Sequence, residues 1–202
     1  DMANINHSTL TDPYLHEPKG AAAAATGQVY VADGAGSGTW AYPPGGWGYY
    51  KDAATAQTFD TTPAKLSIDG AGSTSDSSFL PREIRGTGQL WDTINDKITP
   101  IVAGDSYAVR LDLPVTAKSG TPTELIFELD IGNSTHASGI MIVNKFLATG
   151  KTAPWTVTVS IPIFCGTTFL ANGGQVWLTT DTGTVGITAP AIFISQLSTG
   201  NI

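Results

Sequence analysis

Short segments with the period of a β-strand, separated by turn residues, extend along most of the chain and constrain its fold more than any other feature. In residues 155–163, Trp, Val and Ile alternate with Thr and Ser, the pattern of a strand with one buried face. Residues 107–115 alternate in the same way. Roughly ten such segments follow residue 46, at a spacing of about 8–15 residues. This pattern predicts an all-β, antiparallel sandwich or barrel, with the jelly roll as the leading case.

The expected strands are short and begin before residue 30. They cover residues 28–33, 39–42, 47–51, 57–59, 65–68, 98–101, 107–115, 125–130, 139–143, 155–163, 175–180, 185–187 and 191–197. We expect helical turns at residues 89–96 and 144–147. The Ala-rich residues 21–26 could add a further helical turn, although six residues are too few for a stable helix.

The composition agrees with strands and turns. Only 13% of the 202 residues are charged, about half the share of an ordinary soluble domain, whereas 23 are Gly and 12 are Pro. This excludes an α-helical bundle, a coiled coil and a charge-rich disordered tail. The net charge of −7 and the scattered Lys and Arg residues argue against nucleic acid as a partner, because phosphate binding needs clustered basic side chains.

Residues 1–20 are polar, and Asp12-Pro13 and Glu17-Pro18 favour extended backbone there. Such a segment carries too few apolar side chains to build its own core. We therefore expect an N-terminal arm that is disordered or folds on a partner.

A small β-hairpin is expected after the arm, from the strands at 28–33 and 39–42. The following Pro-Pro-Gly-Gly sequence at 43–46 is a strong break in regular structure. The chain is therefore predicted to hold an arm and hairpin over residues 1–46 and a β-domain over residues 47–202.

Cys165 is the single cysteine and lies in an apolar run, so we expect a buried thiol rather than a nucleophile. A chain without disulfides suits synthesis in a reducing cytoplasm. No apolar run approaches the ~18 residues of a membrane span, and the N-terminus lacks the pattern of a signal peptide. We expect no membrane insertion.

Motifs for metal, cofactor or catalytic chemistry are not found. His7, His16 and His136 are far apart and have no metal-binding spacing. The Gly-rich residues 34–38 lack the Lys-Ser/Thr pair and the helix of a phosphate-binding loop. Neither a GxSxG elbow nor a kinase motif set is present. We expect no cofactor, no metal and no enzymatic activity.

Three acidic residues, Glu124, Glu128 and Asp130, fall on one face of a predicted strand. Paired carboxylates could serve glycoside hydrolysis. The apolar residues that alternate with them would then face the core, so we expect the acids on a solvated face.

Five aromatic residues, Trp40, Tyr42, Trp47, Tyr49 and Tyr50, lie within eleven positions around the Pro-Pro-Gly-Gly break. Trp and Tyr are favoured at protein interfaces because they bury a large area and keep a polar group. The cluster is therefore a candidate trimer interface or core element, and the alternative is a platform that stacks sugar rings.

Residues 161–164 and 191–194 are apolar at consecutive positions, so they would be apolar on both faces of a strand. A sandwich covers only one face of each sheet. A neighbouring subunit could cover the second face, and the low charge content agrees with such an interface. The alternative is a central strand within a monomer.

Residues 12–20 (DPYLHEPKG) and 28–40 (QVYVADGAGSGTW) resemble the N-terminal module of tailed-bacteriophage virion fibres, which include head-fibre, decoration and tail-fibre-like proteins. Residues 90–100, 104–111 and 164–173 resemble the trimeric jelly-roll heads of phage fibres. The fold of such heads is like that of the tumour-necrosis-factor and complement C1q heads.

The resemblance implies a homotrimer that docks through its extended arms to the major capsid protein or another virion protein, on the outer surface of the capsid or tail. The docking residues would be Pro13, Tyr14, Leu15, His16, Glu17, Pro18 and Lys19. Three arms would make weak single contacts durable.

The resemblance therefore implies a structural virion component, a trimeric capsid decoration or head-fibre protein. The chain has no long repetitive shaft, which favours a capsid-surface or short-spike position. The alternative is a short tail fibre or spike adhesin that binds host surface glycan.

Overall fold

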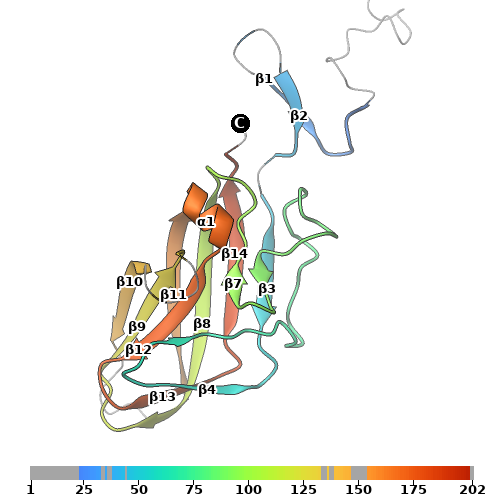
Figure 1. Ribbon diagram of the computed structural model, residues 1–202. Helices are drawn as coiled ribbons and strands as arrows, with labels where there is room; N and C mark the ends of the chain where they lie inside the picture. The colour runs from blue at the N-terminus through green and yellow to red at the C-terminus, as the bar shows by residue number, and fades with distance from the viewer. Residues whose placement is uncertain are drawn as a thin grey trace, which may run out of the picture. The chain divides into compact units, whose positions relative to one another are not determined.

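The computed structural model describes residues 23–32, 35, 38–43, 45–132, 136, 139–146 and 154–200 (Figure 1). The chain divides into two compact units, residues 1–43 together with 202, and residues 44–201. Among the described residues, no helix is long and apolar enough to cross a membrane.

The first unit contains a two-stranded antiparallel hairpin of β1 (Val29–Ala32) and β2 (Gly38–Ala41). The Tyr30 and Trp40 rings meet edge to face across the two strands, with centroids 5.4 Å apart. A turn precedes β1, closed by a hydrogen bond from the Gln28 amide to the Ala25 carbonyl. The predicted helical turn at 21–26 lies partly outside the described residues.

The larger sheet of the second unit is built around one long strand, β8. Its strands are β3 (Trp47–Lys51), β4 (Ala56–Phe59), β8 (Ser106–Ser119), β11 (Trp155–Phe164), β13 (Thr184–Thr188) and β14 (Ala191–Ser198). β8 pairs antiparallel with β11 on one side, and with β14 and then β13 on the other. β14 and β13 pair in turn with β3 and β4. β3 and β4 therefore lie end to end, as do β14 and β13, and the sheet is four strands wide.

The second sheet has the strand order β10-β9-β12-β5 and is also antiparallel. Its strands are β5 (Ala64–Lys65), β9 (Glu124–Asp130), β10 (Gly139–Phe146) and β12 (Gln175–Thr180). The two sheets lie face to face (Figure 1).

Counting β3 with β4, and β13 with β14, as single interrupted strands gives eight strands in chain order. One sheet then has the order 1-8-3-6 and the other 2-7-4-5. This is the strand order of a jelly roll, in which two four-stranded antiparallel sheets pack together. The predicted all-β jelly-roll sandwich is therefore confirmed.

The core lies between the sheets and takes alternate residues from each strand. On β11 the odd-numbered residues from Val157 to Ile163 are buried, and the even-numbered residues are exposed. Leu111 of β8, Ile192 of β14, Phe127 of β9 and Leu178 of β12 are each no more than 1% exposed. Each such side chain contributes about 1.5–3 kcal/mol of burial free energy.

Residues 89–96 were predicted to be helical, and this prediction is wrong. They contain β6 (Trp91–Asp92), which forms a small hairpin with β7 (Lys97–Ile98). The Asp92 carboxylate accepts backbone hydrogen bonds within the turn, and Asp96 takes a left-handed conformation with φ 51°. The fully buried Trp91 side chain fixes the hairpin, because its Nε1 donates to the Ile68 carbonyl over 2.9 Å.

Three smaller differences concern the ends and types of elements. Residues 144–146 are strand, because β10 pairs with β9 as far as Phe146, whereas residue 147 of the expected helical turn lies outside the described residues. The strands expected at 65–68 and 98–101 are limited to β5 and β7, each of two residues. The one α-helix among the described residues, α1 (Thr167–Asn172), was not predicted, and a single residue, Phe169, buries it against the core.

Candidate functional site

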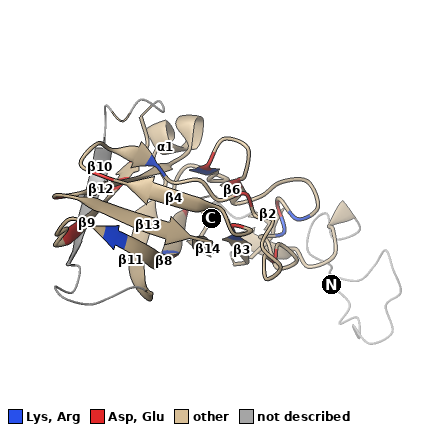
Figure 2. Cartoon of the chain, turned by 90° about the horizontal axis from the view of Figure 1, so that it is seen from below, with Lys and Arg blue, Asp and Glu red and all other residues tan. Residues whose placement is uncertain are grey.

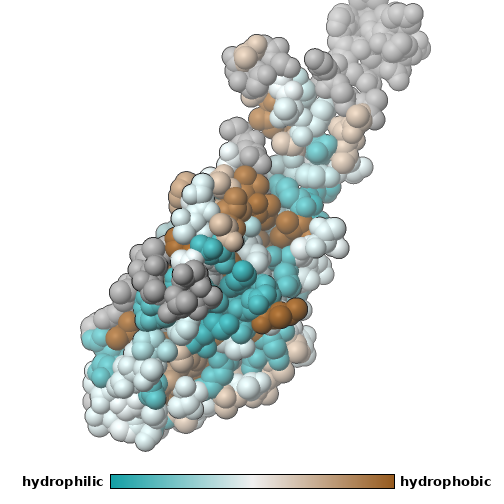
Figure 3. Space-filling view, in the orientation of Figure 1, coloured by the Kyte–Doolittle hydropathy of each residue, from teal (hydrophilic) through white to brown (hydrophobic). Residues whose placement is uncertain are grey.

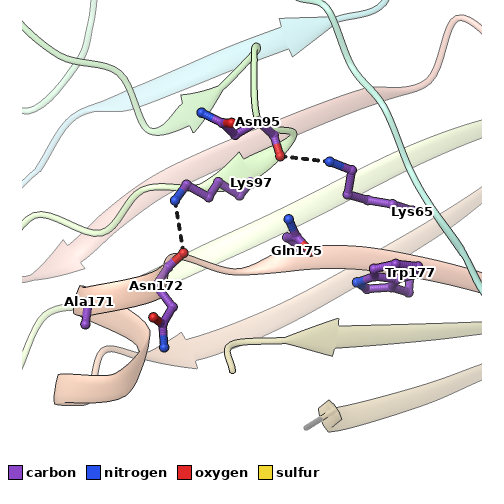
Figure 4. Close-up of a pocket in the computed structure, with 7 residues that line it drawn as sticks. All are labelled: Lys65, Asn95, Lys97, Ala171, Asn172, Gln175 and Trp177. Carbon is purple, nitrogen blue, oxygen red and sulfur yellow. Dashed lines mark hydrogen bonds between the residues drawn. The ribbon is translucent and has the colours of Figure 1, made fainter. Parts of the chain in front are cut away.

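A hollow of about 480 Å³ opens on the outer side of the β10-β9-β12-β5 sheet. Its floor is β12, because Val176 and Leu178 point into the core and the alternate residues Gln175 and Trp177 face outward. We call it the β12 pocket (Figure 4); it is lined by Lys65, Asn95, Lys97, Ala171, Asn172, Gln175 and Trp177. Hydrophilic residues gather over this part of the molecule in Figure 3.

Segments far apart in the sequence build this pocket. Lys65 lies directly opposite Trp177 in the pairing of β5 with β12. Lys97 comes from the β6-β7 hairpin, which a bridge between Ile98 and Gly174 holds against the start of β12. Asn172 is the last residue of α1.

Two ammonium groups lie on the two sides of the opening, with Gln175 and Trp177 beneath them on β12 (Figure 4). The Lys65 Nζ donates to the Asn95 carbonyl over 3.0 Å, and the Lys97 Nζ donates to the Asn172 carbonyl over 3.1 Å. Each ammonium has three protons, so each retains hydrogen-bonding capacity.

The two lysines differ in how close the nearest carboxylate lies to the ammonium group. The Lys65 Nζ lies 3.6 Å from one carboxylate oxygen of Asp96, whose other carboxylate oxygen accepts hydrogen bonds from the Ser67 hydroxyl and the Ile68 amide. Among the described residues, no carboxylate oxygen lies within 4.0 Å of the Lys97 Nζ.

The floor of the pocket carries two unsatisfied hydrogen-bonding atoms. Gln175 is 7% exposed, and its Oε1 has no hydrogen-bond partner. The indole Nε1 of Trp177 is also buried without a partner. Buried polar groups are almost always hydrogen-bonded, and leaving one unpaired costs about 1–3 kcal/mol. An acceptor and a donor therefore remain unpaired on the outward side of β12.

The His136 ring packs against the Trp177 ring. The two rings are tilted against each other with centroids 5.0 Å apart, and the His136 Nε2 lies 2.6 Å from a carboxylate oxygen of Glu128. Glu128 lies opposite Trp177 in the pairing of β9 with β12. The Trp177 ring is thus held between β5 and β9.

The acidic residues of β9 were predicted on a solvated face, and this prediction is only partly right. Glu124 and Glu128 are half-buried on the outer side of the sheet. Asp130 is 2% exposed, because its carboxylate accepts hydrogen bonds from the amides of Gly132 and His136 at the end of the strand. Asp130 closes a turn, and Glu128 holds His136.

A second surface, the outer face of the larger sheet, is apolar. Phe164 and Leu197 are 70% and 55% exposed. The strand register forms a first row of Pro162, Ala108, Ser195 and Trp47, and a second row of Ser160, Arg110, Phe193 and Tyr49. A shallow groove of about 400 Å³ lies over the middle of these rows. We call this surface the β11 face.

The β11 face carries few charges, as does most of the strand surface in Figure 2. Arg110 and Asp112 neutralise each other through a contact of 3.0 Å, and the Arg110 guanidinium lies over the Phe193 ring at 5.7 Å. The apolar face predicted from residues 161–164 therefore exists: Ile161 and Ile163 face the core, whereas Pro162 and Phe164 face outward.

The five aromatic residues singled out in the sequence are divided between the two units and, within the second unit, between the two faces of β3. Trp47 and Tyr49 lie on the β11 face, where the Trp47 ring stacks on Phe79 with centroids 4.9 Å apart and tilts against Phe193 at 5.5 Å. Trp40 and Tyr42 belong to the first unit.

Tyr50 is a core residue, which is one of the roles expected for a member of this aromatic cluster. It points to the inner side of β3 and is 5% exposed. Its hydroxyl accepts a hydrogen bond from the Leu90 amide over 2.9 Å, and burial raises the pKa of this hydroxyl. The predicted docking residues Pro13, Tyr14, Leu15, His16, Glu17, Pro18 and Lys19 lie outside the described residues.

Cys165 is fully buried, as predicted. Burial, together with the neighbouring Asp105 carboxylate, raises the pKa of its thiol to about 11, so the thiolate is scarce at neutral pH. Asp105 itself is fully buried, and its carboxylate accepts hydrogen bonds from the Tyr107 hydroxyl, the Gln196 side chain and the Gly200 amide. This cluster is saturated with internal partners and connects β8 to β14.

Within the described residues, no group of three or more His, Cys, Asp or Glu side chains is placed to hold a metal ion. The β12 pocket was not found from the sequence. One signal was available: Gln175 and Trp177 are alternate residues of a predicted strand whose other face is apolar, so both face outward.

No protein-family model and no curated protein matches the sequence. Three solved structures are similar to it at low identity. The Eiger tumour-necrosis-factor protein of S. frugiperda is 8% identical with a TM-score of 0.47, covering 79% of this chain and 96% of its own. A structure of the Bacillus endospore appendages, described as a family of disulfide-linked pili, is 11% identical with a TM-score of 0.35, covering 78% and 95%.

The third structure, the PRD1 vertex protein P5, is 12% identical with a TM-score of 0.42, covering 77% of this chain and 98% of its own. All three TM-scores are below 0.5, so these likenesses carry no argument about function. The jelly-roll assignment rests on the strand order and register of this chain.

Proposed function

We propose that this chain is a structural component of a bacteriophage virion, a homotrimeric capsid decoration or head-fibre protein that docks through residues 13–19. The observation that carries the proposal is the β11 face, an open sheet surface with Phe164 and Leu197 largely exposed. Exposed apolar patches of this kind mark protein interaction sites. The resemblance of residues 12–20 and 28–40 to phage fibre modules supplies the virion context.

A second copy of the chain is the occupant that we propose for the β11 face. The face is rich in aromatic and small side chains, and its Arg110-Asp112 pair is already neutralised within the sheet. Obligate interfaces between copies are more apolar than other surfaces and depleted in charge. A threefold arrangement is heterologous, so the β11 face of each copy would contact a different surface of the next copy around the ring.

The test compares two variants of the full chain by size-exclusion chromatography with light scattering. The unchanged protein is expected at three times the 21.0 kDa chain mass. Phe164→Glu combined with Leu197→Glu places charges on the β11 face and is expected to give monomers. Ile94→Glu is the matched control, because Ile94 is 86% exposed on the β6-β7 hairpin and is expected to leave the trimer intact. A monomeric unchanged protein, or a trimeric double variant, would contradict the proposal.

Deleting residues 1–20 tests the docking step separately. The truncated protein is expected to remain trimeric and to lose cosedimentation with phage particles that lack this protein. Continued attachment of the truncated trimer would show that the arm does not dock.

The alternative function, a short fibre adhesin that binds host glycan, receives no support from Tyr50 or Trp47, two of the five aromatic residues. Tyr50 is in the core, and Trp47 is stacked on Phe79 and Phe193, so neither ring offers an open platform to a sugar. A polar ligand fits a different part of the molecule.

A further inference from the structure

We propose that the β12 pocket binds an acidic saccharide, a sugar unit that carries a carboxylate. This inference goes beyond the structural role and does not depend on trimer formation, because all the lining residues come from one chain. No residue of the pocket belongs to the β11 face.

The shape of the pocket fits one or two sugar units. Its volume of about 480 Å³ falls within the range of small-ligand sites, about 300–1,000 Å³. The floor is β12, in a sheet with strands on both sides of it, and the Gln175 and Trp177 side chains are held by that strand. Such a floor is preorganised, because no loop has to close to form it.

The positive charge of the pocket favours an anion. Lys97 has no carboxylate oxygen within 4.0 Å among the described residues, and its Nζ is held by the Asn172 carbonyl. Lys65 provides a second ammonium, partly compensated by Asp96 at 3.6 Å. A carboxylate between the two ammonium groups would accept charge-assisted hydrogen bonds from both.

A simple anion without a donor group could not form hydrogen bonds with both of the unpaired atoms in the pocket floor. The Gln175 Oε1 needs a hydrogen-bond donor, which a deprotonated carboxylate or the dianion of a phosphomonoester does not have. A sugar hydroxyl supplies that donor, and a hydroxyl or ring oxygen can accept from the Trp177 Nε1. A ligand with hydroxyl groups and one carboxylate therefore satisfies the lysines and both unpaired atoms.

The nearby acids limit the charge that the pocket can hold. Asp96, Asp92 and Glu128 lie around it, and Glu128 is engaged with His136. A ligand with several negative charges would meet these carboxylates. One carboxylate per sugar unit matches Lys97, which has no carboxylate oxygen within 4.0 Å among the described residues.

The experiment is saturation-transfer and titration NMR on the full chain with the methyl glycosides of glucuronic and galacturonic acid. Methyl glucoside and methyl galactoside are the neutral matched probes, and sodium acetate and inorganic phosphate are the simple anions. We expect at least one acidic glycoside to bind about tenfold more tightly than its neutral partner and than either anion. Its binding should shift the Trp177 indole proton, assigned with Trp177→Phe.

Three variants locate the site. Lys97→Met is expected to weaken binding about tenfold, and Gln175→Met, which removes the unpaired oxygen at similar size, is expected to weaken it severalfold. Lys118→Met removes a lysine from β8, on the other sheet, and is expected to bind normally. Lys97 is a surface residue, so the test remains valid if Gln175→Met fails to fold.

Each contrary result overturns a defined part of the proposal. Equal binding of acidic and neutral glycosides would remove the role of the lysines. Equal binding of acetate or phosphate would reduce the pocket to a simple anion site. No binding at millimolar concentration, or normal binding by Lys97→Met, would overturn the site itself.

Discussion

The two outer faces of the sandwich differ in what their side chains leave unsatisfied. The β11 face leaves apolar area uncovered, with Phe164 70% exposed, while its Arg110 and Asp112 are paired within the sheet. The β12 pocket leaves two hydrogen-bonding atoms, in Gln175 and Trp177, without partners, and its Lys97 ammonium is in no ion pair among the described residues. Both faces belong to sheets whose inner sides are equally apolar. The outward residues alone therefore distinguish a surface suited to another protein from one suited to a small polar ligand.

Leu111→Ala is expected to have the largest effect on stability, because Leu111 packs in the core between the two sheets that carry these faces. Leu111 is fully buried on the inner side of β8. We expect a loss of about 2–5 kcal/mol in the free energy of unfolding, from lost burial and the cavity that remains. Denaturant unfolding measures it, with the surface variant Leu197→Ala expected within about 0.5 kcal/mol of the unchanged protein under conditions where both are monomeric. A loss below about 1 kcal/mol would show that the core between the sheets is not packed as described.

Salt is expected to separate the two faces. Raising sodium chloride from about 0.05 to 0.5 M shortens the range of charge interactions, so the affinity of an acidic glycoside for the β12 pocket should fall severalfold. The mass of the assembly should not change, because apolar contacts are not screened. Titration NMR and light scattering on the same samples measure both. Dissociation of the assembly with no change in glycoside affinity would contradict the assignment of an apolar contact to the β11 face and of a charged site to the β12 pocket.

A smaller effect distinguishes the inside of β11 from its outside. Phe164 faces outward, whereas the next residue, Cys165, is buried with a thiol pKa raised from 9.0 to about 11. Burial disfavours the thiolate in the folded protein, so the stability from the neutral thiol is present below pH 9 and is lost as the pH rises through about 11. Unfolding at pH 8 and 10.5 should show a larger decrease for the unchanged protein than for Cys165→Ala. Equal decreases would show that Cys165 does not contribute.

Strand positions could be predicted where one face of a strand is plainly apolar, as in residues 107–115 and 155–163. The sequence does not say which face of β3 is buried, because Trp47, Tyr49 and Tyr50 make both of its faces aromatic. The structure settles this through long-range packing, in which the Tyr50 hydroxyl accepts from Leu90, forty positions away.

The β12 pocket needs tertiary structure for the same reason. Lys65 and Lys97 approach it only because β5 pairs with β12, and because Ile98 bridges to Gly174. Neither pairing leaves a local pattern in the sequence. The helix α1 was missed because its six residues are too few for a helical period, and one buried side chain, Phe169, holds it.

The interruptions of the larger sheet lie at one level. β3 ends beside the break between β14 and β13, where the Asp52 amide donates to the Pro190 carbonyl over 2.9 Å. On β8 the pairing with β13 skips one residue between Val115 and Ala117, and the β11 pairing stops at Val115. The strand pairing of the larger sheet is therefore interrupted at the same level in each of its strands. Beyond this level, β4, β13 and the end of β8 form one part of the sheet. This part can lose its amide protection against hydrogen exchange as one unit, while the rest of the sandwich stays folded.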